Sequence, residues 1–280
     1  RNGQALNQQW NFATPKVGVN WAPTPATRWW ANVSRSQEAP TFWEIVAATV
    51  APNNPAGASS ELVRLNLQRA TTLEVGGQGR WGEGSHATQW TLAVYRSEVD
   101  DELMSTTDAN GIKVGTYNYQ GGTRHQGIEA GLSGSWPLGA DASALQWRGA
   151  WTFSDFRFKG GEYAGNRIAG VPRHLLSAEL LWRVHSGTGT WRVGPNLRWM
   201  PTDTPTDHAN TPGSEQDAYA LLGFKLEWQS GPWSAYLLAE NLTDRRYASS
   251  YAIRNRATPD QPGYLPGLGR SVAAGVSYQF

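Results

Sequence analysis

The sequence has no cysteine, no long hydrophobic run and almost no net charge, and each of these absences excludes a class of protein. Without cysteine there is neither a disulfide scaffold nor a thiolate metal site. No window approaches the ~20 apolar residues of a membrane-spanning helix, and the mean hydropathy of the chain is negative. The formal net charge of +1 provides no electrostatic attraction for nucleic acid, so nucleic acid is not an expected partner.

Motifs for catalysis and cofactor binding are also missing. No histidine has a second histidine four residues away, and neither His-Glu-x-x-His nor Gly-x-Ser-x-Gly occurs. The acidic run from Asp100 to Glu102 could suggest a calcium site, but we interpret it as the solvated base of a loop. Gly76, Gly77 and Gly79 superficially resemble a phosphate loop, yet no helix follows them, so they are interpreted as easing strand curvature. We therefore expect no enzyme, no cofactor and no metal site.

Tryptophan is abundant, with 15 residues, and it recurs on both sides of short polar segments. An indole combines an apolar body with one N–H group, and the membrane–water interface selects such side chains. The sequence therefore predicts a membrane-interface girdle made of Trp21, Trp29, Trp81, Trp90, Trp136, Trp147, Trp182, Trp191, Trp228, Trp233 and the terminal Phe280.

Between these tryptophans, apolar and polar residues alternate with a period of two. Leu222, Phe224 and Leu226 share one face of their segment, whereas Lys225 and Glu227 lie on the other. A soluble β-sandwich would alternate too, but its apolar face would favour Val, Ile and Leu over a row of Trp at one end. Alternating segments of about 10 residues, apolar outside and polar inside, are typical of transmembrane barrels. The pattern predicts an all-β, antiparallel transmembrane β-barrel.

The segments predict about eleven strands, at roughly 12–22, 27–36, 68–81, 87–101, 116–136, 142–157, 171–185, 189–201, 217–229, 232–242 and 268–280. Short turns and long connections alternate between them, and in this class the short turns face the periplasm and the long loops face outside. Bacterial single-chain barrels normally have an even number of strands, and closure requires every edge to be paired. We therefore expect these eleven strands to be half of a larger barrel.

Several segments resemble the C-terminal half of a TonB-dependent outer-membrane receptor barrel. The most specific are Ala239–Tyr247 (AENLTDRRY) and Pro266–Arg270 (PGLGR), and the segments Ala13–Trp21, Ala31–Ile45 and Tyr117–Glu129 are similar as well. The resemblance implies a 22-stranded barrel of which residues 1–280 are the C-terminal part. It also implies an N-terminal plug domain and a first half of the barrel, both absent from this chain, and a location in the outer membrane of a Gram-negative bacterium.

The resemblance further implies an active-transport receptor that binds a scarce metal complex, with a ferric siderophore as the expected cargo, and imports it into the periplasm with TonB energy. The implied partners are the TonB complex, reached through the absent N-terminal part, and outer-membrane lipid and lipopolysaccharide. The barrel-assembly machinery is expected to read the terminal strand, whose apolar ladder is Val272, Ala274, Val276, Tyr278 and Phe280.

Two other functions remain open at this point. In a passive porin, the polar faces of the strands would line an open channel. A barrel enzyme such as an outer-membrane protease or lipase is a third possibility, disfavoured by the lack of a catalytic constellation. Ala39–Ile45 resembles a segment of haem receptors that precedes a histidine-bearing loop, but residues 51–68 contain no histidine, which disfavours haem.

Candidate ligand contacts are tyrosines and arginines near the external strand ends and in the long loops. Ferric siderophores are often anionic with planar chelating groups, which guanidinium groups and aromatic rings suit physically. Tyrosine is also a common interfacial anchor. The predicted contacts are Tyr117, Tyr119, Arg124, Tyr163, Arg167, Tyr247, Tyr251, Arg254 and Tyr264.

Overall fold

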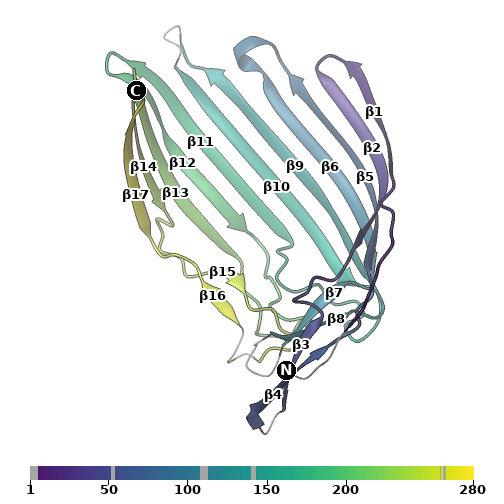
Figure 1. Cartoon of the computed structure of the whole chain (residues 1–280). Coiled ribbons are helices and arrows are strands. Elements are labelled where there is room, and N and C mark those ends of the chain that lie inside the picture. Colours follow the sequence, from purple (N-terminus) through teal and green to yellow (C-terminus); the bar gives the residue numbers. More distant parts are fainter. Residues whose placement is uncertain (1–5, 52–53, 108–112, 140–142, 259, 261–262) are drawn as a thin grey trace.

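The computed structural model describes residues 6–51, 54–107, 113–139, 143–258, 260 and 263–280, and it is built almost entirely of antiparallel strands. The main sheet has eleven strands, each paired with the next along the chain (Figure 1). They are β1 Lys16–Thr24, β2 Thr27–Glu38, β5 Gln68–Trp81, β6 Thr88–Asp100, β9 Thr123–Pro137, β10 Ala144–Phe158, β11 His174–Ser186, β12 Gly189–Met200, β13 Tyr219–Ser230, β14 Trp233–Glu240 and β17 Ser271–Tyr278. The predicted eleven antiparallel strands are confirmed.

Three small hairpins lie inside the long connections at one end of the sheet (Figure 1). They pair β3 Val46–Ala51 with β4 Asn54–Leu62, β7 Leu103–Thr107 with β8 Lys113–Asn118, and β15 Ala248–Tyr251 with β16 Tyr264–Pro266. The opposite end of the sheet carries the short turns. One single-turn helix, Gly84–His86, occupies the β5–β6 turn. No helix among the described residues is long and apolar enough to cross a membrane.

The prediction of one continuous strand at 116–136 is wrong for the first part of that range. Tyr117 and Asn118 belong to β8, which pairs with Leu103 and Met104 of β7 rather than continuing the main sheet. The chain then turns through Gly121 and Gly122, whose φ angles of 114° and 68° lie in the left-handed region that glycine tolerates best. The main strand β9 therefore starts at Thr123.

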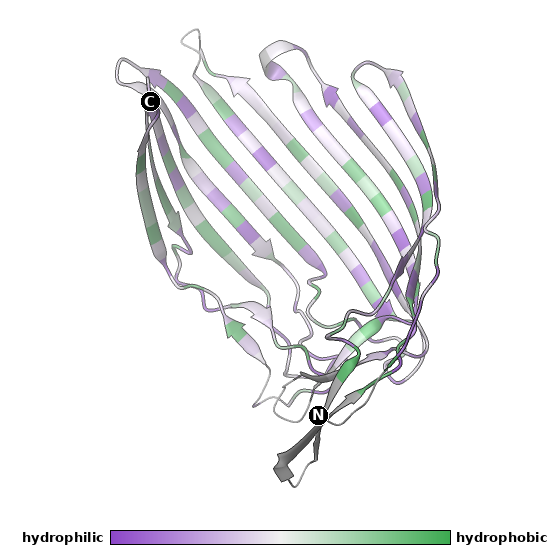
Figure 2. Ribbon diagram, in the orientation of Figure 1, coloured by the Kyte–Doolittle hydropathy of each residue, from purple (hydrophilic) through white to green (hydrophobic). Residues whose placement is uncertain are grey.

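The sheet is bent into an open trough, and its two faces differ in chemistry. The convex face carries apolar side chains that no second layer covers, such as Val19, Leu73 and Leu132, all more than a third exposed. The concave face carries polar side chains such as Glu179 and Lys225. The alternation appears as bands of opposite hydropathy along each strand (Figure 2). A sandwich would bury one face of the sheet against another sheet, so the structure is that of a barrel wall.

The indoles of the predicted girdle lie on the convex face near the short turns. The Trp90 ring lies 5.4 Å from that of Trp29 and 5.8 Å from that of Trp81, measured between centroids. A Cβ atom on Gly77 would stand 2.4 Å from the Trp29 ring, so this glycine provides room for the indole. Trp30 points to the concave face instead, where its Nε1 donates a hydrogen bond to Glu74 Oε1 at 2.6 Å.

Candidate functional site

The hydrophobic core of the described chain lies beneath the long connections rather than within the sheet. It consists of Met104, Tyr119, Phe158, Tyr163 and Ile168. Phe158 is the last residue of β10 and shares the parity of Arg148, which puts it on the concave side. Its ring centroid lies 4.6 Å from that of Tyr119 and 5.3 Å from that of Tyr163. The connections are thus folded inward over the mouth of the trough.

Hydrogen bonds fix two of these tyrosines in place. Tyr119 Oη donates to the carbonyl of Gly160 at 2.6 Å and accepts the backbone N–H of Tyr163 at 3.0 Å. Both tyrosines are only 3% exposed. Burial, reinforced by the nearby Glu162 carboxylate, raises the pKa of Tyr117 to about 12. These side chains hold two connections together, with little surface left for a ligand.

A buried carboxylate ties the β12–β13 connection to the β14–β17 connection. Asp207 is fully buried and accepts hydrogen bonds from Thr211 N at 2.9 Å, Thr211 Oγ1 at 2.5 Å and Ala257 N at 2.7 Å. The next residue, His208, donates its backbone N–H to the carbonyl of Arg254 at 3.0 Å. A buried carboxylate is tolerated when hydrogen-bond donors satisfy it in this way.

Two titratable groups lie close to this point. Burial lowers the pKa of His208, although the Glu102 and Asp207 carboxylates oppose the shift. For Glu102, burial raises the pKa, but hydrogen bonds from His125 and Thr123 outweigh it and the net pKa is lowered. Glu102 Oε2 lies 3.4 Å from His125 Nε2. The mouth therefore holds a neutral imidazole and a carboxylate at neutral pH.

The segment Ala239–Tyr247 forms a second tie, at the end of β14. Asn241 adopts a φ of 49°, and its side chain accepts the N–H of Arg245 at 2.8 Å while donating to the carbonyls of Arg245 and Leu268. Asp244 Oδ1 accepts the backbone N–H of Arg270 at 3.0 Å. The two most specific resembling segments are thus in direct contact, and their role in this structure is to anchor the last connection.

Beside this tie, tyrosines and an arginine converge on the concave side of the mouth. The ring of Tyr219, at the start of β13, lies 4.9 Å from that of Tyr247. Burial, reinforced by the nearby Tyr219, raises the pKa of Tyr251 to about 12. Tyr264 is exposed, and its Oη donates to the carbonyl of Glu215 at 2.5 Å. Arg198 of β12 is near Tyr219 and Tyr251 and is exposed.

A hollow of about 130 Å³ opens into this group, lined among others by Asn196, Arg198, Glu240 and Tyr247. Within the described part of the chain, Arg198 forms no ion pair, and its charge acts on Tyr219 and Tyr251. We name Arg198, Tyr219, Tyr247, Tyr251 and Tyr264 the mouth cluster. An unpaired guanidinium among aromatic rings suits an anionic, planar ligand.

The structure separates the nine predicted contacts into four groups. Tyr247, Tyr251 and Tyr264 come together in the mouth cluster, whereas Tyr117, Tyr119 and Tyr163 belong to or pack against the buried core. Arg254 is half-buried and its backbone bridges to Asp207. Arg124 lies on the convex face of β9, and Arg167 forms a β-bridge with Arg157 of that face.

Sequence reasoning had not included Arg198 and Tyr219 among the contacts. Both are residues of main-sheet strands, whereas the predicted contacts were chosen among strand ends and long loops. Their position could have been found from the alternation, because each occupies a concave-face position at the external end of its strand.

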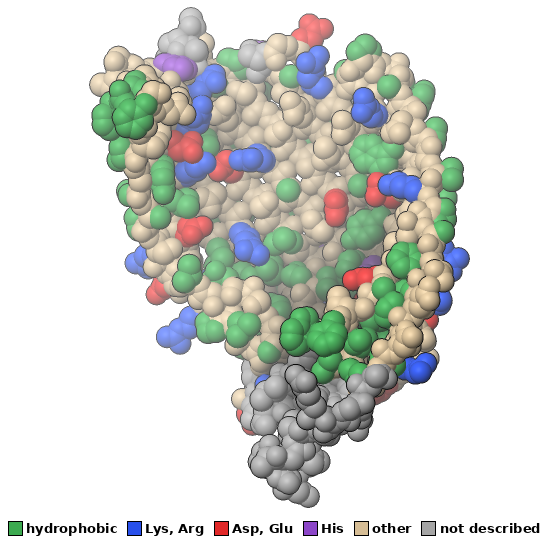
Figure 3. Space-filling view, viewed as in Figure 1, with side chains coloured by type: hydrophobic (Ala, Val, Ile, Leu, Met, Phe, Trp, Pro, Cys, Tyr) green, Lys and Arg blue, Asp and Glu red, His purple; other side chains and the backbone are tan. Residues whose placement is uncertain are grey.

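Further along the concave wall, charges of both signs form a continuous ladder (Figure 3). Arg148 pairs with Glu179 at 2.9 Å, and Lys225 lies 3.8 Å from Glu179 and 2.9 Å from Glu227. Arg192 adds a contact of 3.9 Å to Glu227. The ladder lines a hollow of about 660 Å³ on the wall. The concave cations of this region are therefore neutralised by neighbouring strands.

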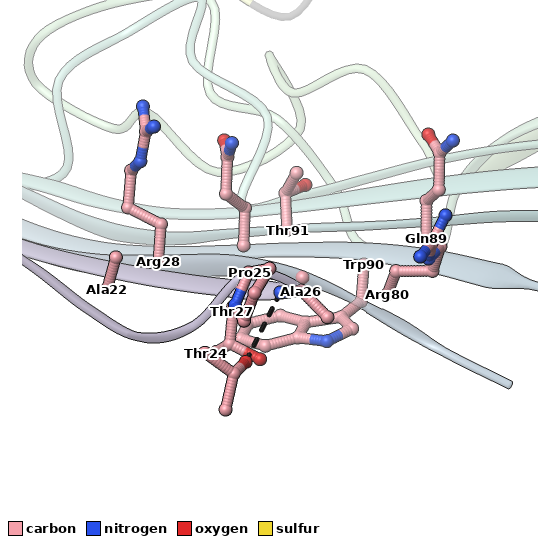
Figure 4. A pocket seen from close by; sticks show the side chains of 12 residues that line it. Ala22, Thr24, Pro25, Ala26, Thr27, Arg28, Arg80, Gln89, Trp90 and Thr91 are labelled. Carbon is pink, nitrogen blue, oxygen red and sulfur yellow. Dashed lines mark hydrogen bonds between the residues drawn. The ribbon is translucent and has the colours of Figure 1, made fainter.

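A second wall hollow, of about 600 Å³, lies next to the β1–β2 turn. Figure 4 shows Arg28, Thr91 and Gln89 on one side of the strands and the Trp90 ring on the other. The Trp90 ring packs with the indoles of Trp29 and Trp81 on the convex side. The lining of this hollow is polar and open to solvent, and it contains no acid and no histidine.

The acidic run divides among separate partners. Asp100 lies 3.6 Å from Lys159, Asp101 lies 3.5 Å from Arg69, and Glu102 faces Thr123 and His125. Across the described ranges, no three His, Asp or Glu side chains are grouped so as to hold a metal ion. The run therefore bridges strands and loops.

Comparison with known families assigns the chain. Residues 1–242 match the family model described as TonB dependent receptor-like, beta-barrel. The chain belongs to the TonB-dependent receptor family. Proteins of this family are transporters of the Gram-negative outer membrane, not enzymes, and the open sheet is a section of such a barrel. No match was found among curated proteins.

Solved structures share the fold of this TonB-dependent receptor section at low sequence identity. The siderophore receptor PiuA from Acinetobacter baumannii is 18% identical with a TM-score of 0.66, over 95% of this chain and 36% of that one. A mutant of the ferric enterobactin receptor PfeA from Pseudomonas aeruginosa is 17% identical with a TM-score of 0.65, over 95% and 40%. The copper transporter OprC is 14% identical with a TM-score of 0.68, over 95% and 39%. The chain thus spans little more than a third of the length of these proteins.

Proposed function

We propose that this chain is the C-terminal part of a 22-stranded receptor that binds a metal chelate at the cell surface, with an anionic ferric siderophore as the cargo. In outer-membrane barrels the short turns face the periplasm and the long connections face outside. The mouth cluster would then lie at the external entrance to the lumen. Import into the periplasm would use a plug domain and TonB, both contacted through parts of the receptor beyond this chain.

The observation that carries the proposal is the exposed Arg198, which forms no ion pair with the described residues, beside the tyrosines of the mouth cluster. Tyrosine rings offer flat apolar faces with a hydroxyl at one end, and the guanidinium offers directed donors to carboxylate, catecholate or hydroxamate oxygens. The printed names of PiuA and PfeA support a chelated-iron cargo, and that of OprC supports a metal cargo more generally.

The test is equilibrium binding of a panel of ferric siderophores to the full-length receptor and its Arg198→Ala variant. We expect a loss of about 1.5–3 kcal/mol for the bound member of the panel, because a hydrogen bond to a charged group is lost. Arg192→Ala is the matched control, since Arg192 lies on the same strand and face but is near Glu227. It should leave the affinity unchanged.

Tyr251→Phe and Tyr264→Phe refine the test. If ring contact dominates, both should bind within about threefold of the wild type, whereas Tyr→Ala at either position should weaken binding. Equal affinity in Arg198→Ala and wild type for every chelate bound would remove the mouth cluster from the ligand site. Ion conductance through the intact protein without any chelate binding would favour a passive pore instead.

A further inference from the structure

A cluster of arginines lies on the convex face at the external end of the sheet. In the β9–β10 register, Arg124 is opposite Arg157, Gln126 is opposite Asp155, and Ile128 is opposite Phe153. Ile128 and Phe153 line a hollow on the apolar convex surface together with Leu73, Val75 and Val94. Since side chains two residues apart share a face, Arg124 and Arg157 lie on the same surface as this apolar band, further toward the outside.

Two further arginines join them from the β10–β11 connection. Arg167 forms a β-bridge with Arg157, and its guanidinium donates to the carbonyls of Asp203 at 3.0 Å and Val171 at 3.3 Å. The guanidinium carbon of Arg173 lies 5.8 Å from the centroid of the Phe153 ring. The Arg173 guanidinium makes no hydrogen bond to any residue in the described part of the chain.

The carboxylates near this cluster do not neutralise it. Asp155 lies 2.7 Å from Arg157 and 3.6 Å from Arg124, so one acid serves two arginines. Asp203 is near Arg167 but accepts the backbone N–H of Ala218 at 2.9 Å. Four arginines against these two acids leave an excess of two positive charges.

Glu98, opposite Arg124 on β6, is already engaged by other cations. Its carboxylate lies 2.7 Å from Arg96 and 3.0 Å from Lys159. Burial, together with the like charges of Arg173 and Arg157, lowers the pKa of Arg167. An anion bound among Arg124, Arg157, Arg167 and Arg173 would offset their excess positive charge and the mutual repulsion that lowers the pKa of Arg167.

We propose that Arg124, Arg157, Arg167 and Arg173 form a binding site for the phosphate headgroup of an acylated lipid in the outer leaflet. Guanidinium groups bind phosphate in a bidentate geometry, and cations at a membrane interface attract anionic lipid. The acyl chains would lie along Phe153, Ile128 and Val94, directly below the arginines. This adjacency selects an acylated phosphate over a free one. The site depends on membrane placement and not on the identity of the transported cargo.

The test uses the full-length receptor in detergent and measures binding of phosphatidic acid by native mass spectrometry. Two further probes separate the parts of the ligand: diacylglycerol has the chains without the phosphate, and glycerol phosphate has the phosphate without the chains. The proposal predicts that phosphatidic acid binds at least tenfold more tightly than either. Equal binding of glycerol phosphate and phosphatidic acid would show a free-anion site and overturn it.

The variant Arg124→Gln/Arg173→Gln should lower binding of phosphatidic acid by at least tenfold. Arg148→Gln is the matched control, because it removes an arginine of the concave face and should bind the lipid as the wild type does. Equal losses in the two variants, or none in either, would overturn the site.

Heat-modifiable migration on gels reports whether each variant is folded. If the double variant fails to fold, Arg173→Gln alone replaces it, because the Arg173 guanidinium makes no hydrogen bond to the described residues and the substitution leaves its backbone carbonyl free to accept from Ser154 N. That single variant should still weaken binding of phosphatidic acid by about threefold or more, and unchanged binding would contradict the proposal.

Discussion

The two faces of one barrel wall treat the same side chains differently. On the concave face, Arg148 and Lys225 are interleaved with Glu179 and Glu227 from neighbouring strands. On the convex face, Arg124 and Arg157 share Asp155, and the Arg173 guanidinium lies over the Phe153 ring with no hydrogen bond to the described residues. Charges along the wet lumen are satisfied by each other and by water, whereas the arginines at the edge of the apolar band share fewer carboxylates. The comparison shows that the surroundings, more than the residue type, determine what an arginine does here.

Tyrosines divide in a similar way within the mouth. Tyr119 and Tyr163 are locked into the core by rings and by hydrogen bonds, whereas Tyr264 stays exposed and Tyr247 borders a hollow. The first group forms a rigid floor, and the second is free to contact a ligand. Rigid support beneath adaptable contacts is the arrangement that precise recognition requires.

The largest effect expected from this division comes from Phe158→Ala. Phe158 is 1% exposed and touches both locked tyrosines, so its removal leaves a cavity that costs about 3–5 kcal/mol of local stability. Hydrogen exchange of the amides between β10 and β11 should accelerate accordingly. Limited proteolysis should cut the same connection.

Trp136→Ala is the matched control for Phe158→Ala, because Trp136 is a large aromatic residue that is 63% exposed on the convex face. It should leave exchange in the β10–β11 connection unchanged. Equal protection of that connection in Phe158→Ala and wild type would mean that the aromatic cluster does not hold the mouth closed.

The period-two pattern predicted the strands well because it is a local property. No second layer packs against the main sheet, so the alternation within a strand is enough to tell its two faces apart. Leu222 could therefore be assigned to the apolar face and Lys225 to the polar face from the sequence. The same rule carried outward from Ile128 would also have placed Arg124 on the convex face. The candidate contacts were instead chosen by closeness to the strand ends, which groups both faces together.

The mouth could not be predicted in the same way. Its contacts join connections far apart in the chain, as when Asp207 accepts the N–H of Ala257 or Tyr219 meets Tyr247. No local periodicity encodes such pairs, since each depends on how a long connection folds back over the trough. The break at Gly121 and Gly122 has the same origin, because the β7–β8 hairpin takes up residues that otherwise continue the alternation of β9.

A smaller loss of stability is expected in the connections at the mouth when the pH is lowered. Burial lowers the pKa of His208 from its ordinary value of 6.5. Below about pH 6.5, a state in which the connections have unfolded locally and exposed His208 therefore binds a proton that the folded state does not. The stabilisation is complete above that pH and declines as the pH falls toward the lowered value. Glu102, whose pKa is lowered from 4.5, acts in the same direction, but only below about pH 4.5.

Hydrogen exchange at pH 7 and pH 5.5, corrected for the intrinsic rate, measures this decline around Tyr163 and His208. His208→Phe should abolish it, because the ring still packs against Phe158 and Tyr163. His86→Phe, at the short-turn end, should retain it. Identical pH dependence in His208→Phe and wild type would assign the effect to another group.

The smallest effect separates two adjacent indoles, Trp29 on the convex face and Trp30 on the concave face. Trp30→Phe removes the hydrogen bond from Nε1 to Glu74 Oε1, and Asn32 at 3.4 Å is then the remaining donor to that oxygen. The expected cost is about 1 kcal/mol, since the carboxylate can recover part of its solvation from lumenal water.

Trp29→Phe keeps a ring over Gly77 and breaks no hydrogen bond in the described structure, so it should cost less. Urea-unfolding midpoints in lipid vesicles compare the two variants, and the double variant Trp30→Phe/Glu74→Leu should lose little more than Glu74→Leu alone, because Glu74→Leu already removes the acceptor of the Trp30 hydrogen bond. A larger loss for Trp29→Phe than for Trp30→Phe would show that the indole at the membrane surface contributes more than the hydrogen bond inside the wall, and the contrast between the two faces would then reverse for tryptophan.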